Sequence, residues 1–228
     1  PEYLRRLIQR RLGHEPTTYI LGHCEFYGIE FYIDYGAFIP RPETEVLVEE
    51  AIQLAHHLSQ QKGQIKIADI GTGCGAIAIS LALALPQAKI YATDISALAL
   101  EVAEINCRRH RVNRQVELLP GNLLEPLPQP VDMIVANLPY IKNCEFKDLS
   151  PEIRHYEPMM ALSGGEDGLD KIQQMLEQMP GKLSYGACFL LEIGQGQGRM
   201  VTSLIKNYFP QASVELISDL GGIERVIE

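Results

Sequence analysis

One segment in the first third of the chain, residues 65–75 (IKIADIGTGCG), limits the possible folds more than any other. It is an apolar run that ends in an acid and is followed by three glycines at alternate positions. The apolar residues have the size and branching of a buried parallel strand, and residues 76–85 (AIAISLALAL) are apolar enough for a buried helix. A glycine turn between them lets the backbone approach a ligand and leaves free N–H groups at the helix N-terminus. We therefore expect an α/β domain with a ligand site at this turn.

The spacing of the glycines indicates which ligand the turn would bind. Dinucleotide sites favour G-x-G-x-x-G, where a pyrophosphate sits at the start of the helix. Here Gly71, Gly73 and Gly75 give G-x-G-x-G, and Asp69 lies two residues before the first glycine. A carboxylate there would repel a pyrophosphate but suits a ligand with an ammonium group, such as S-adenosyl-L-methionine. A tight turn without a ligand remains an alternative, because a glycine-rich turn alone is weak evidence of a site.

Length, composition and charge narrow the class of protein. The 228 residues suffice for one large α/β domain, or for a domain with a small appendage. A hydrophobic share of 46% is ordinary for a globular protein, and no apolar run approaches the ~18 residues of a membrane span. The net charge of −9 argues against broad nucleic-acid binding, which depends on neutralising phosphates. We interpret the arginine groups at 5–11 and 108–114 as solvated faces, and we expect a monomer with no membrane or stable nucleic-acid partner.

The five cysteines indicate a reducing compartment. They are scattered, odd in number and without C-x-x-C spacing, which fits reduced thiols better than disulfides or a zinc site. The first residues do not have the pattern of a signal peptide. We therefore expect a cytoplasmic protein without a bound metal. Because the chain begins with Pro1 rather than Met, we also expect that further residues precede it.

The rest of the chain predicts alternating helices and strands. Helices are expected over residues 2–12, 42–58, 97–110, 169–179 and 198–209. Strands are expected over residues 89–93, 116–119, 131–136, 187–193, 213–217 and 224–227, with a strand-like pattern at 19–21 and a β-hairpin over 25–33. Residues 141–168 form a long irregular stretch, and such loops are usually functional. The alternation predicts a mostly parallel, doubly wound sheet with helices on both faces and an antiparallel hairpin of the last two strands at one edge.

Polar side chains stand at or just beyond the ends of other expected strands as well. Asp94 lies roughly 20 residues after the glycine turn, the spacing at which an acid reaches ribose hydroxyls, although it could instead be a helix N-cap. Asn122 could face an adenine edge, because an amide both donates and accepts, but a simple turn asparagine is equally compatible. Ligands of open α/β sheets bind beyond the carboxyl ends of the strands, so these groups are candidates for one site.

The tetrapeptide Asn137-Leu138-Pro139-Tyr140 at the end of another strand is the most informative. An amide nitrogen is a poor nucleophile, and an enzyme can help by accepting hydrogen bonds from its N–H groups. The Asn137 side-chain oxygen and the Leu138 backbone oxygen are two neighbouring acceptors, and Pro139 favours an extended Leu138, which fixes its carbonyl. Tyr140 can lie flat against a planar group. These residues fit methyl transfer driven by orientation, and the alternative is a strand-ending turn with a packed tyrosine.

An ordered series of motifs resembles the release-factor glutamine N5-methyltransferase family over almost the full length. The motifs are EPTTYILGHCEFYG, IPRPETE, DIGTGCGAIAISLA, TDIS, IVANLPYI, LSPEIRHYEP, ALSGGEDGLD, LEIGQGQG and DLGGIERV. The resemblance implies a seven-stranded, mostly parallel, doubly wound sheet of the class I S-adenosylmethionine-dependent methyltransferase type with an antiparallel C-terminal strand. It also implies that residues 1–40 are the end of an N-terminal helical domain plus a linker β-hairpin, and that residues 41–228 are the catalytic domain.

The resemblance further implies the substrate and the roles of individual residues. The methyl group would pass from S-adenosyl-L-methionine, leaving S-adenosyl-L-homocysteine, to the glutamine of the Gly-Gly-Gln motif in class 1 peptide chain release factors. The cofactor-binding residues would be Asp69, Gly71, Thr72, Gly73, Cys74, Gly75, Asp94, Ile95, Asn122, Leu123 and Asn137. The catalytic residues would be Asn137, Leu138, Pro139 and Tyr140, which would also bind substrate together with Phe38, Arg41, Glu43 and Thr44.

Two departures from the family pattern leave other functions open. Leu138 replaces a proline that the family usually has, which should cost pre-organisation of about 1 kcal/mol and leaves the backbone acceptor in place. Asn122 stands where an acid is commoner, and it accepts more weakly from an adenine amino group. One alternative is methylation of adenine or guanine amino groups in nucleic acid, which the acidic charge disfavours. Another is a cofactor-binding protein with impaired catalysis, and a nicotinamide dehydrogenase is the least favoured.

Overall fold

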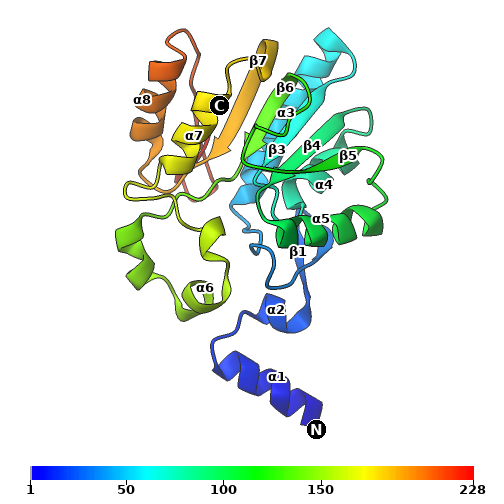
Figure 1. Cartoon of the computed structure of the whole chain (residues 1–228), viewed down its shortest axis with the longest axis vertical. Helices are drawn as coiled ribbons and strands as arrows, with labels where there is room; N and C mark the ends of the chain where they lie inside the picture. Colours follow the sequence, from blue (N-terminus) through cyan, green and yellow to red (C-terminus); the bar gives the residue numbers. More distant parts are fainter. Residues whose placement is uncertain (1) are drawn as a thin grey trace.

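The computed structural model describes residues 2–228 and has a seven-stranded sheet at its centre (Figure 1). The strands are β3 (Lys66–Ile70), β4 (Lys89–Asp94), β5 (Val116–Pro120), β6 (Val131–Ala136), β7 (Leu183–Glu192), β8 (Leu216–Ser218) and β9 (Glu224–Ile227). Their order across the sheet is β5-β4-β3-β6-β7-β9-β8. The first five of these run parallel, and β9 is antiparallel to both of its neighbours. The predicted α/β class, parallel sheet and antiparallel hairpin at one edge are confirmed.

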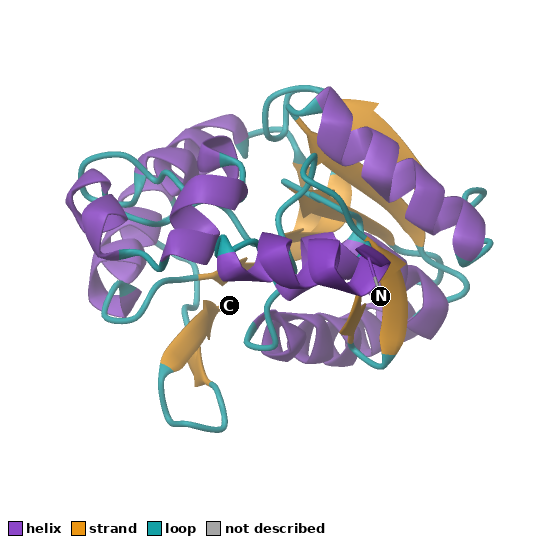
Figure 2. Ribbon diagram, turned by 90° about the horizontal axis from the view of Figure 1, so that it is seen from below, coloured by secondary structure: helices purple, strands orange, loops and turns teal. Residues whose placement is uncertain are grey.

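Helices cover both faces of this sheet (Figure 2). One layer contains α3 (Thr44–Lys62), α4 (Ala76–Ala84) and α5 (Ala97–Arg109), and the opposite layer contains α7 (Asp170–Gln178) and α8 (Gly198–Tyr208). Side chains of β6 alternate between the two cores, with Met133 and Val135 facing the first layer and Ile134 and Ala136 the second. Apolar residues on both sides of one strand are what a doubly covered parallel sheet requires.

The chain reverses direction across the sheet between β3 and β6. From β3 it moves outward through β4 to β5 and then returns to β6 on the other side of β3. Loops at such a switch point leave the sheet in opposite directions, which opens a crevice beyond the carboxyl ends of the strands. The glycine turn after β3 and Asn137 after β6 therefore flank the same crevice. Among residues 2–228, no helix is both long and apolar enough to span a bilayer.

The predicted hairpin before the sheet is confirmed as β1 (His23–Phe26) and β2 (Ile29–Tyr32). Its two-residue turn has positive φ at both positions, 52° at Tyr27 and 68° at Gly28, which matches the twist of the flanking strands. Phe26 and Phe31 are almost fully buried in the same core as α3 to α5. The hairpin therefore packs against the sheet domain and shares its hydrophobic core.

The strand-like pattern at residues 19–21 is wrong, because these residues belong to the helix α2 (Thr17–Leu21). Pro16 precedes the helix, and Gly22 ends it at φ 78° with its N–H bonded to the Thr18 carbonyl at 2.8 Å. Tyr19 is buried, and its hydroxyl donates to the Ala37 carbonyl at 2.8 Å. This tertiary anchor outweighs the β propensity of threonine, tyrosine and isoleucine. The sequence signals that could have predicted the helix are the proline before it and the glycine after it.

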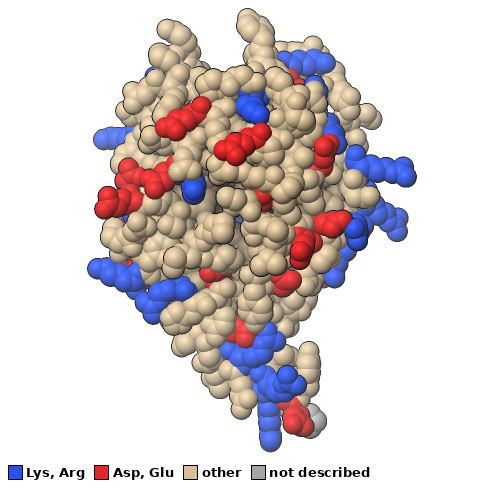
Figure 3. Space-filling model, in the orientation of Figure 1, with Lys and Arg blue, Asp and Glu red and all other residues tan. Residues whose placement is uncertain are grey.

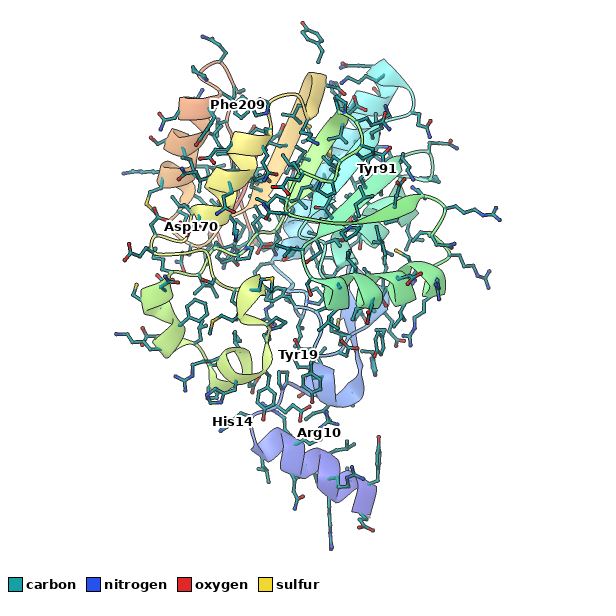
Figure 4. All side chains as sticks on the ribbon, in the orientation of Figure 1. Arg10, His14, Tyr19, Tyr91, Asp170 and Phe209 are labelled. Carbon is teal, nitrogen blue, oxygen red and sulfur yellow. The ribbon has the colours of Figure 1, made fainter. Side chains whose placement is uncertain are left out.

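The first helix, α1 (Glu2–Leu12), projects from the body at the N-terminal end (Figure 1). None of its residues is buried, and its arginines lie on an exposed tip (Figure 3). Arg10 holds the helix to the body, where Tyr19 lies nearby (Figure 4). Its Nε donates to Glu15 Oε2 at 2.8 Å, and its Nη2 donates to the Tyr35 hydroxyl at 3.1 Å. The predicted helix at 2–12 is confirmed.

The long stretch over 141–168 is less irregular than predicted. It contains η1 (Asn143–Asp148), α6 (Pro151–Tyr156) and η2 (Met159–Ala161). These helices span at most two turns, too short for a hydrophobic period to reveal them in the sequence. From α6, Glu152 forms an ion pair with Arg11, and the Tyr156 hydroxyl donates to the Gly13 carbonyl at 2.7 Å. The segment therefore links the first helix to the sheet domain.

Three element boundaries differ from the sequence-based ranges by more than two residues. α3 continues to Lys62, four residues beyond the predicted end, because the polar residues of its last turn carry no apolar signal. β7 begins at Leu183, where its pairing with Val131 is separated from the rest by an irregularity. β8 is restricted to three residues. None of these differences moves a residue of the crevice.

Asn106 in α5 fastens the hairpin to the glycine turn. Its side chain is fully buried, and its Oδ1 accepts the Tyr32 N–H at 2.8 Å. Its Nδ2 donates to the Tyr32 carbonyl and to the Cys74 carbonyl, each at 2.9 Å. One amide thus satisfies backbone groups from two segments that would otherwise be buried without partners.

We expect Asn106→Ala to lower the free energy of unfolding by about 2–4 kcal/mol, because three backbone groups lose their partner in a buried place. Urea denaturation measures this change. Asn113→Ala, at an exposed position near the end of the same helix, serves as the control and should change stability by less than about 0.5 kcal/mol. Equal stability of the two variants would contradict the anchoring role.

Candidate active site

A cavity of about 360 Å³ opens in the crevice beyond the carboxyl ends of β3, β4 and β6. Its wall combines the glycine turn, the start of α5, the tetrapeptide after β6, the segment before α3 and parts of the 141–168 segment. All but three of the predicted site residues line this one cavity, and the exceptions are Asp69, Gly75 and Glu43. Segments far apart in the sequence therefore meet in a single site.

The glycine turn forms one wall of the cavity, and its backbone adopts a conformation that favours glycine. Gly71, Gly73 and Gly75 have φ values of 72°, 56° and 85°, in the left-handed region. The Gly71 N–H is bonded to the Thr93 carbonyl at 2.9 Å, which ties the turn to β4. Gly75 serves packing, since a Cβ there would lie 3.3 Å from the Cβ of Ala103 on α5. It is therefore a structural glycine, whereas Gly71 and Gly73 face the cavity.

Thr72 and Cys74, between these glycines, also line the cavity but are nearly buried. Burial raises the pKa of the Cys74 thiol to about 12, so the thiol stays protonated and is a poor nucleophile. All five cysteines are free, in agreement with the reduced thiols that the spacing predicted. The turn thus contributes shape and backbone groups rather than a reactive side chain.

Asp94 presents a carboxylate to the cavity from the end of β4. One oxygen accepts the Gly73 N–H at 2.9 Å and the other accepts the Ser96 N–H at 2.8 Å. The N-cap interpretation of Asp94 is wrong, because Ser96 caps α5 by accepting the Ala99 N–H at 3.2 Å. Burial raises the pKa of Asp94, and the two N–H donors oppose that shift. Each carboxylate oxygen of Asp94 can still accept a hydrogen bond from a hydroxyl group in the cavity. The next residue, Ile95, also lines the cavity, and its side chain is exposed.

Asp69 does not reach the cavity, although the sequence suggested that it could face a ligand's ammonium group. Its side chain is fully buried beneath the turn. Its Oδ2 accepts the Thr72 hydroxyl at 2.6 Å and the Ala78 N–H at 3.1 Å, so it braces the turn against the start of α4. Burial, the largest influence, raises the pKa of Asp69 to about 7.

Asn122 and Leu123, beyond β5, line the opposite side of the cavity. The Asn122 Nδ2 donates to Glu125 at 3.3 Å, which leaves the side-chain oxygen as the group available for a ligand. Leu123 has a φ of 52°, a conformation that costs a non-glycine residue about 1–2 kcal/mol. Such backbone strain is typical of ligand-binding turns.

Asn137 turns its side chain toward α3 and the cavity. Its Nδ2 donates to the Thr44 hydroxyl oxygen at 3.0 Å, and both residues line the cavity. With the amide nitrogen committed to Thr44, Oδ1 is left as an acceptor at the cavity surface. Leu138 follows with its side chain against Gly71, where a Cβ on the glycine would lie 3.4 Å from Leu138 Cδ2. The tetrapeptide and the glycine turn are therefore in direct contact.

The backbone after the tetrapeptide is clamped by the segment that follows η2. The Ile141 N–H is bonded to the Leu162 carbonyl at 3.0 Å, and the Gly164 N–H to the Ile141 carbonyl at 2.9 Å. Only glycine fits at position 164, because a Cβ there would lie 2.8 Å from the Pro139 carbonyl oxygen. The buried Gln197 also donates to the Tyr140 carbonyl at 3.2 Å. These contacts fix the direction of the Asn137–Tyr140 backbone.

Tyr140 and Glu192 form a polar contact behind the cavity wall. The Tyr140 hydroxyl donates to Glu192 Oε1 at 3.1 Å. Burial raises the pKa of Tyr140, and the neighbouring carboxylate raises it further, so the hydroxyl keeps its proton. Burial also raises the pKa of Glu192, which is 2% exposed, at the end of β7.

The segment before α3 closes the side of the cavity. Arg41 stacks over Phe38, with its guanidinium carbon 4.5 Å from the ring centroid, and both residues line the cavity. Arg41 also forms an ion pair with the buried Glu157, just after α6. Glu43, predicted to bind substrate, is exposed and lies outside the cavity wall.

Several cavity residues were not identified from the sequence. The 141–168 segment contributes mostly apolar side chains, among them Ile141, Ile153, Pro158, Met160 and Leu162. The start of α7 adds one amine, Lys171. The motifs LSPEIRHYEP and ALSGGEDGLD marked this region, but apolar residues in a loop give no signal that separates a cavity wall from core.

Comparisons with known proteins identify the family. A family model described as the methyltransferase small domain matches residues 49–153. The release factor glutamine methyltransferase of Bacillus anthracis is 39% identical over 224 residues, which covers 96% of this chain and 78% of the relative. The chain belongs to the release factor glutamine methyltransferase family. Another member, from Gloeobacter violaceus, is 38% identical over 228 residues. This match covers 99% of this chain and 78% of that relative.

The fold of this family member is shared with distant methyltransferases. The crystal structure of a methyltransferase from Pyrococcus furiosus superposes with a TM-score of 0.61 at 18% identity, covering 99% of this chain and 95% of that one. At this identity the likeness concerns the fold alone. The predicted class I methyltransferase architecture is confirmed.

We expect the buried Asp69 to make stability depend on pH. Burial holds its pKa at about 7, above the ordinary value, so the folded protein binds the proton more tightly than the unfolded chain. Its contribution to stability is therefore complete below about pH 4 and is lost as the pH rises through about 7. The free energy of unfolding of Asp69→Asn, relative to that of the wild type, should therefore rise by about 1 kcal/mol or more as the pH is raised from 5 to 8.

Urea denaturation at a series of pH values measures this difference. Asp148→Asn, at an exposed position, is the control, and its difference from the wild type should stay constant over the same range. A constant difference for Asp69→Asn as well would show that the folded protein holds this carboxyl ionised throughout.

Proposed function

We propose that this chain transfers the methyl group of S-adenosyl-L-methionine to the side-chain amide nitrogen, N5, of the glutamine in the Gly-Gly-Gln motif of class 1 peptide chain release factors. Family membership supports the methyl transfer and the class of substrate, through relatives that are named for it. The observation that carries the proposal is the Asn137 amide, whose nitrogen is bound by Thr44 and whose oxygen is left for the cavity. An acceptor beside the glycine turn is what amide methylation needs.

The residues of the cavity fit the cofactor. Asp94 offers two carboxylate oxygens, the geometry suited to a pair of ribose hydroxyls, and Asn122 offers an amide oxygen for an adenine amino group. Between them the wall is largely apolar, as a purine requires, with Ile77 and Leu123 contributing. Gly71 and Gly73 leave room for close approach to the backbone. S-adenosyl-L-methionine, when bound, supplies an electrophilic methyl group on a sulfonium, and S-adenosyl-L-homocysteine is the product.

The chain's own residues would act mainly by orientation. The Asn137 side-chain oxygen and the Leu138 backbone oxygen accept the two N–H groups of the glutamine amide, which holds the nitrogen in one place. The clamp on the Tyr140 backbone keeps these acceptors fixed, and the Tyr140 ring lies beside the planar amide. Arg41 and Phe38 form the side where a protein loop would enter. Holding the reacting atoms in line supplies most of the rate enhancement.

The remaining assignments belong to the same proposal. We infer a protein substrate rather than a nucleic acid from the family and from the net charge of −9. Free thiols and the substrate class suit a protein that works in the cytoplasm, and we infer that it acts as a monomer. We infer that residues 1–40 form the end of an N-terminal domain with its linker hairpin, and that residues 41–228 form the catalytic domain.

Asn137→Ala should lower methyl transfer by about 100-fold or more while S-adenosyl-L-methionine still binds, because the variant loses an acceptor that holds the substrate amide. Mass spectrometry of the release factor after incubation measures transfer, and calorimetry measures cofactor binding. Asn143→Ala, at an exposed position, is the control. Normal turnover by Asn137→Ala would exclude the role of this amide.

Leu138→Pro tests whether the chain is catalytically impaired. If leucine weakens only pre-organisation, restoring proline should raise turnover by less than about tenfold, in line with roughly 1 kcal/mol. The assay uses the same release factor and includes RNA and DNA as competing substrates. A wild type that binds the cofactor but methylates nothing, with activity appearing only in Leu138→Pro, would contradict the proposed function.

A further inference from the structure

A buried glutamine joins the tetrapeptide after β6 to two other segments of the chain. Gln197 is 4% exposed and lies at the start of α8, in the loop that follows β7. Its Oε1 accepts the Gly194 N–H at 2.8 Å, and its Nε2 donates to the Tyr140 carbonyl at 3.2 Å and to the Gly168 carbonyl at 3.4 Å. The side chain therefore uses its oxygen and both of its N–H donors on backbone groups.

The direction of this amide follows from its three partners. The Gly194 N–H can only donate, and the carbonyls of Tyr140 and Gly168 can only accept. A reversed amide would place its NH₂ group against the Gly194 N–H and its oxygen against two carbonyl oxygens. Gln197 therefore has one orientation that satisfies all three backbone groups, as buried polar groups require.

Glycines around the amide let these segments come close together. At Gly168, a Cβ would lie 2.4 Å from the Tyr140 carbonyl oxygen and 2.6 Å from Gln197 Nε2. At Gly194, a Cβ would lie 2.9 Å from Gln197 Oε1 and 3.1 Å from Cδ2 of the Tyr140 ring. A side chain at either position would push the amide or Tyr140 away. The motifs ALSGGEDGLD and LEIGQGQG, which contain Gly168 and Gln197, therefore meet at Tyr140.

We propose that Gln197 is a positioning residue, which fixes the backbone of the tetrapeptide so that the Leu138 carbonyl points at the substrate amide. Gln197 does not line the cavity, so it acts through Tyr140 rather than on the substrate. Only Pro139, whose φ is fixed by its ring, separates Tyr140 from Leu138. A restraint on the Tyr140 carbonyl and ring therefore limits the direction of the Leu138 carbonyl. The role rests on the proposed function, because it matters only if the substrate is an amide held by these acceptors.

This restraint matters more in a chain that has leucine at position 138. A proline there would fix its own φ, whereas Leu138 leaves that rotation to be fixed by its surroundings. The buried Leu138 side chain packs against Gly71 on one side, and Gln197 holds the backbone two residues further on. Gln197 thus supplies part of the pre-organisation that the replacement of proline removes.

The first test is Gln197→Glu, which keeps the length of the side chain and removes both N–H donors. An ionised carboxylate would face the carbonyl oxygens of Tyr140 and Gly168 and repel them. At about pH 8 we expect kcat for the release factor to fall by about tenfold or more, while the Kd for S-adenosyl-L-methionine changes by less than about threefold. Gln195→Glu is the matched control, because Gln195 is an exposed residue of the same loop and undergoes the same change of charge.

The pH profile separates a lost donor from a general loss of structure. Burial would raise the pKa of a glutamate at this place, and the Glu224 carboxylate, which lies against Gly198, would raise it further. Lys142, whose side chain lies against Gly168, would oppose them. A protonated glutamate regains one O–H donor, so the ratio of variant to wild-type kcat should rise as the pH is lowered from about 9 to about 6. The same ratio for Gln195→Glu should stay constant.

Gln197→Met removes the donors without adding a charge, and it serves in place of the glutamate variant if that variant does not fold. We expect kcat to fall by about tenfold or more, with the pH profile of the wild type. Adding Leu138→Pro should raise kcat by a larger factor in Gln197→Met than in the wild type, because the proline ring replaces part of the missing restraint. Circular dichroism shows whether each variant is folded under the assay conditions.

A measurement on the wild type alone uses NMR of protein labelled with ¹⁵N-glutamine. Both side-chain NH₂ hydrogens of Gln197, assigned through their proximity to Gly194, should exchange slowly with solvent, because both are donated to carbonyls in a buried place. Exchange as fast as that of the exposed Gln195 amide would overturn the proposed restraint.

The outcomes distinguish this role from the proposed function itself. Folded Gln197→Glu and Gln197→Met variants with wild-type kcat at every pH would overturn the positioning role and leave the methyltransferase function intact. An equal effect of Leu138→Pro in both backgrounds would also contradict it. A wild type that does not methylate the release factor would instead overturn the proposed function.

Discussion

The hydrogen bond from Asn137 Nδ2 to Thr44 Oγ1 joins the end of β6 to the start of α3 across the mouth of the sheet. A carboxamide that must accept at a reaction site needs its nitrogen held elsewhere, and this contact supplies that restraint. Thr44, the acceptor in this contact, is almost fully buried. Behind the same wall, the buried Glu192 at the end of β7 accepts the Tyr140 hydroxyl at 3.1 Å. Site geometry therefore depends on groups that the substrate never touches.

The scaffold fixes the other side of the site by backbone hydrogen bonds rather than by side-chain chemistry. Three left-handed glycines bend the chain tightly, Asp69 braces the turn from below, and Asn106 ties it to the hairpin. A parallel sheet buried on both faces gives these segments a rigid base. Rigid positioning of this kind suits a reaction whose rate comes from orientation.

Much of this arrangement could be read from the sequence, because the apolar strands and the glycine turn have strong local signals. The order of elements predicted the sheet, and the strand ends predicted which residues would meet. Other features depend on contacts that no local pattern contains. The helix at residues 17–21 exists because Tyr19 is anchored to Ala37, and Asp69 turned out to lie under the turn because α4 starts directly above it. No local pattern singles out Glu192, and only the fold brings its carboxylate against the Tyr140 hydroxyl.

The central claim is that two neighbouring oxygens after β6 hold a glutamine amide in line with a methyl donor bound at the glycine turn. A crystal structure with S-adenosyl-L-homocysteine and a peptide that contains Gly-Gly-Gln tests this most directly. The account predicts the glutamine nitrogen about 3 Å from both the Asn137 side-chain oxygen and the Leu138 carbonyl oxygen, facing the sulfur. A glutamine bound elsewhere, or an Asn137 side chain turned away from it into the interior, would contradict the account.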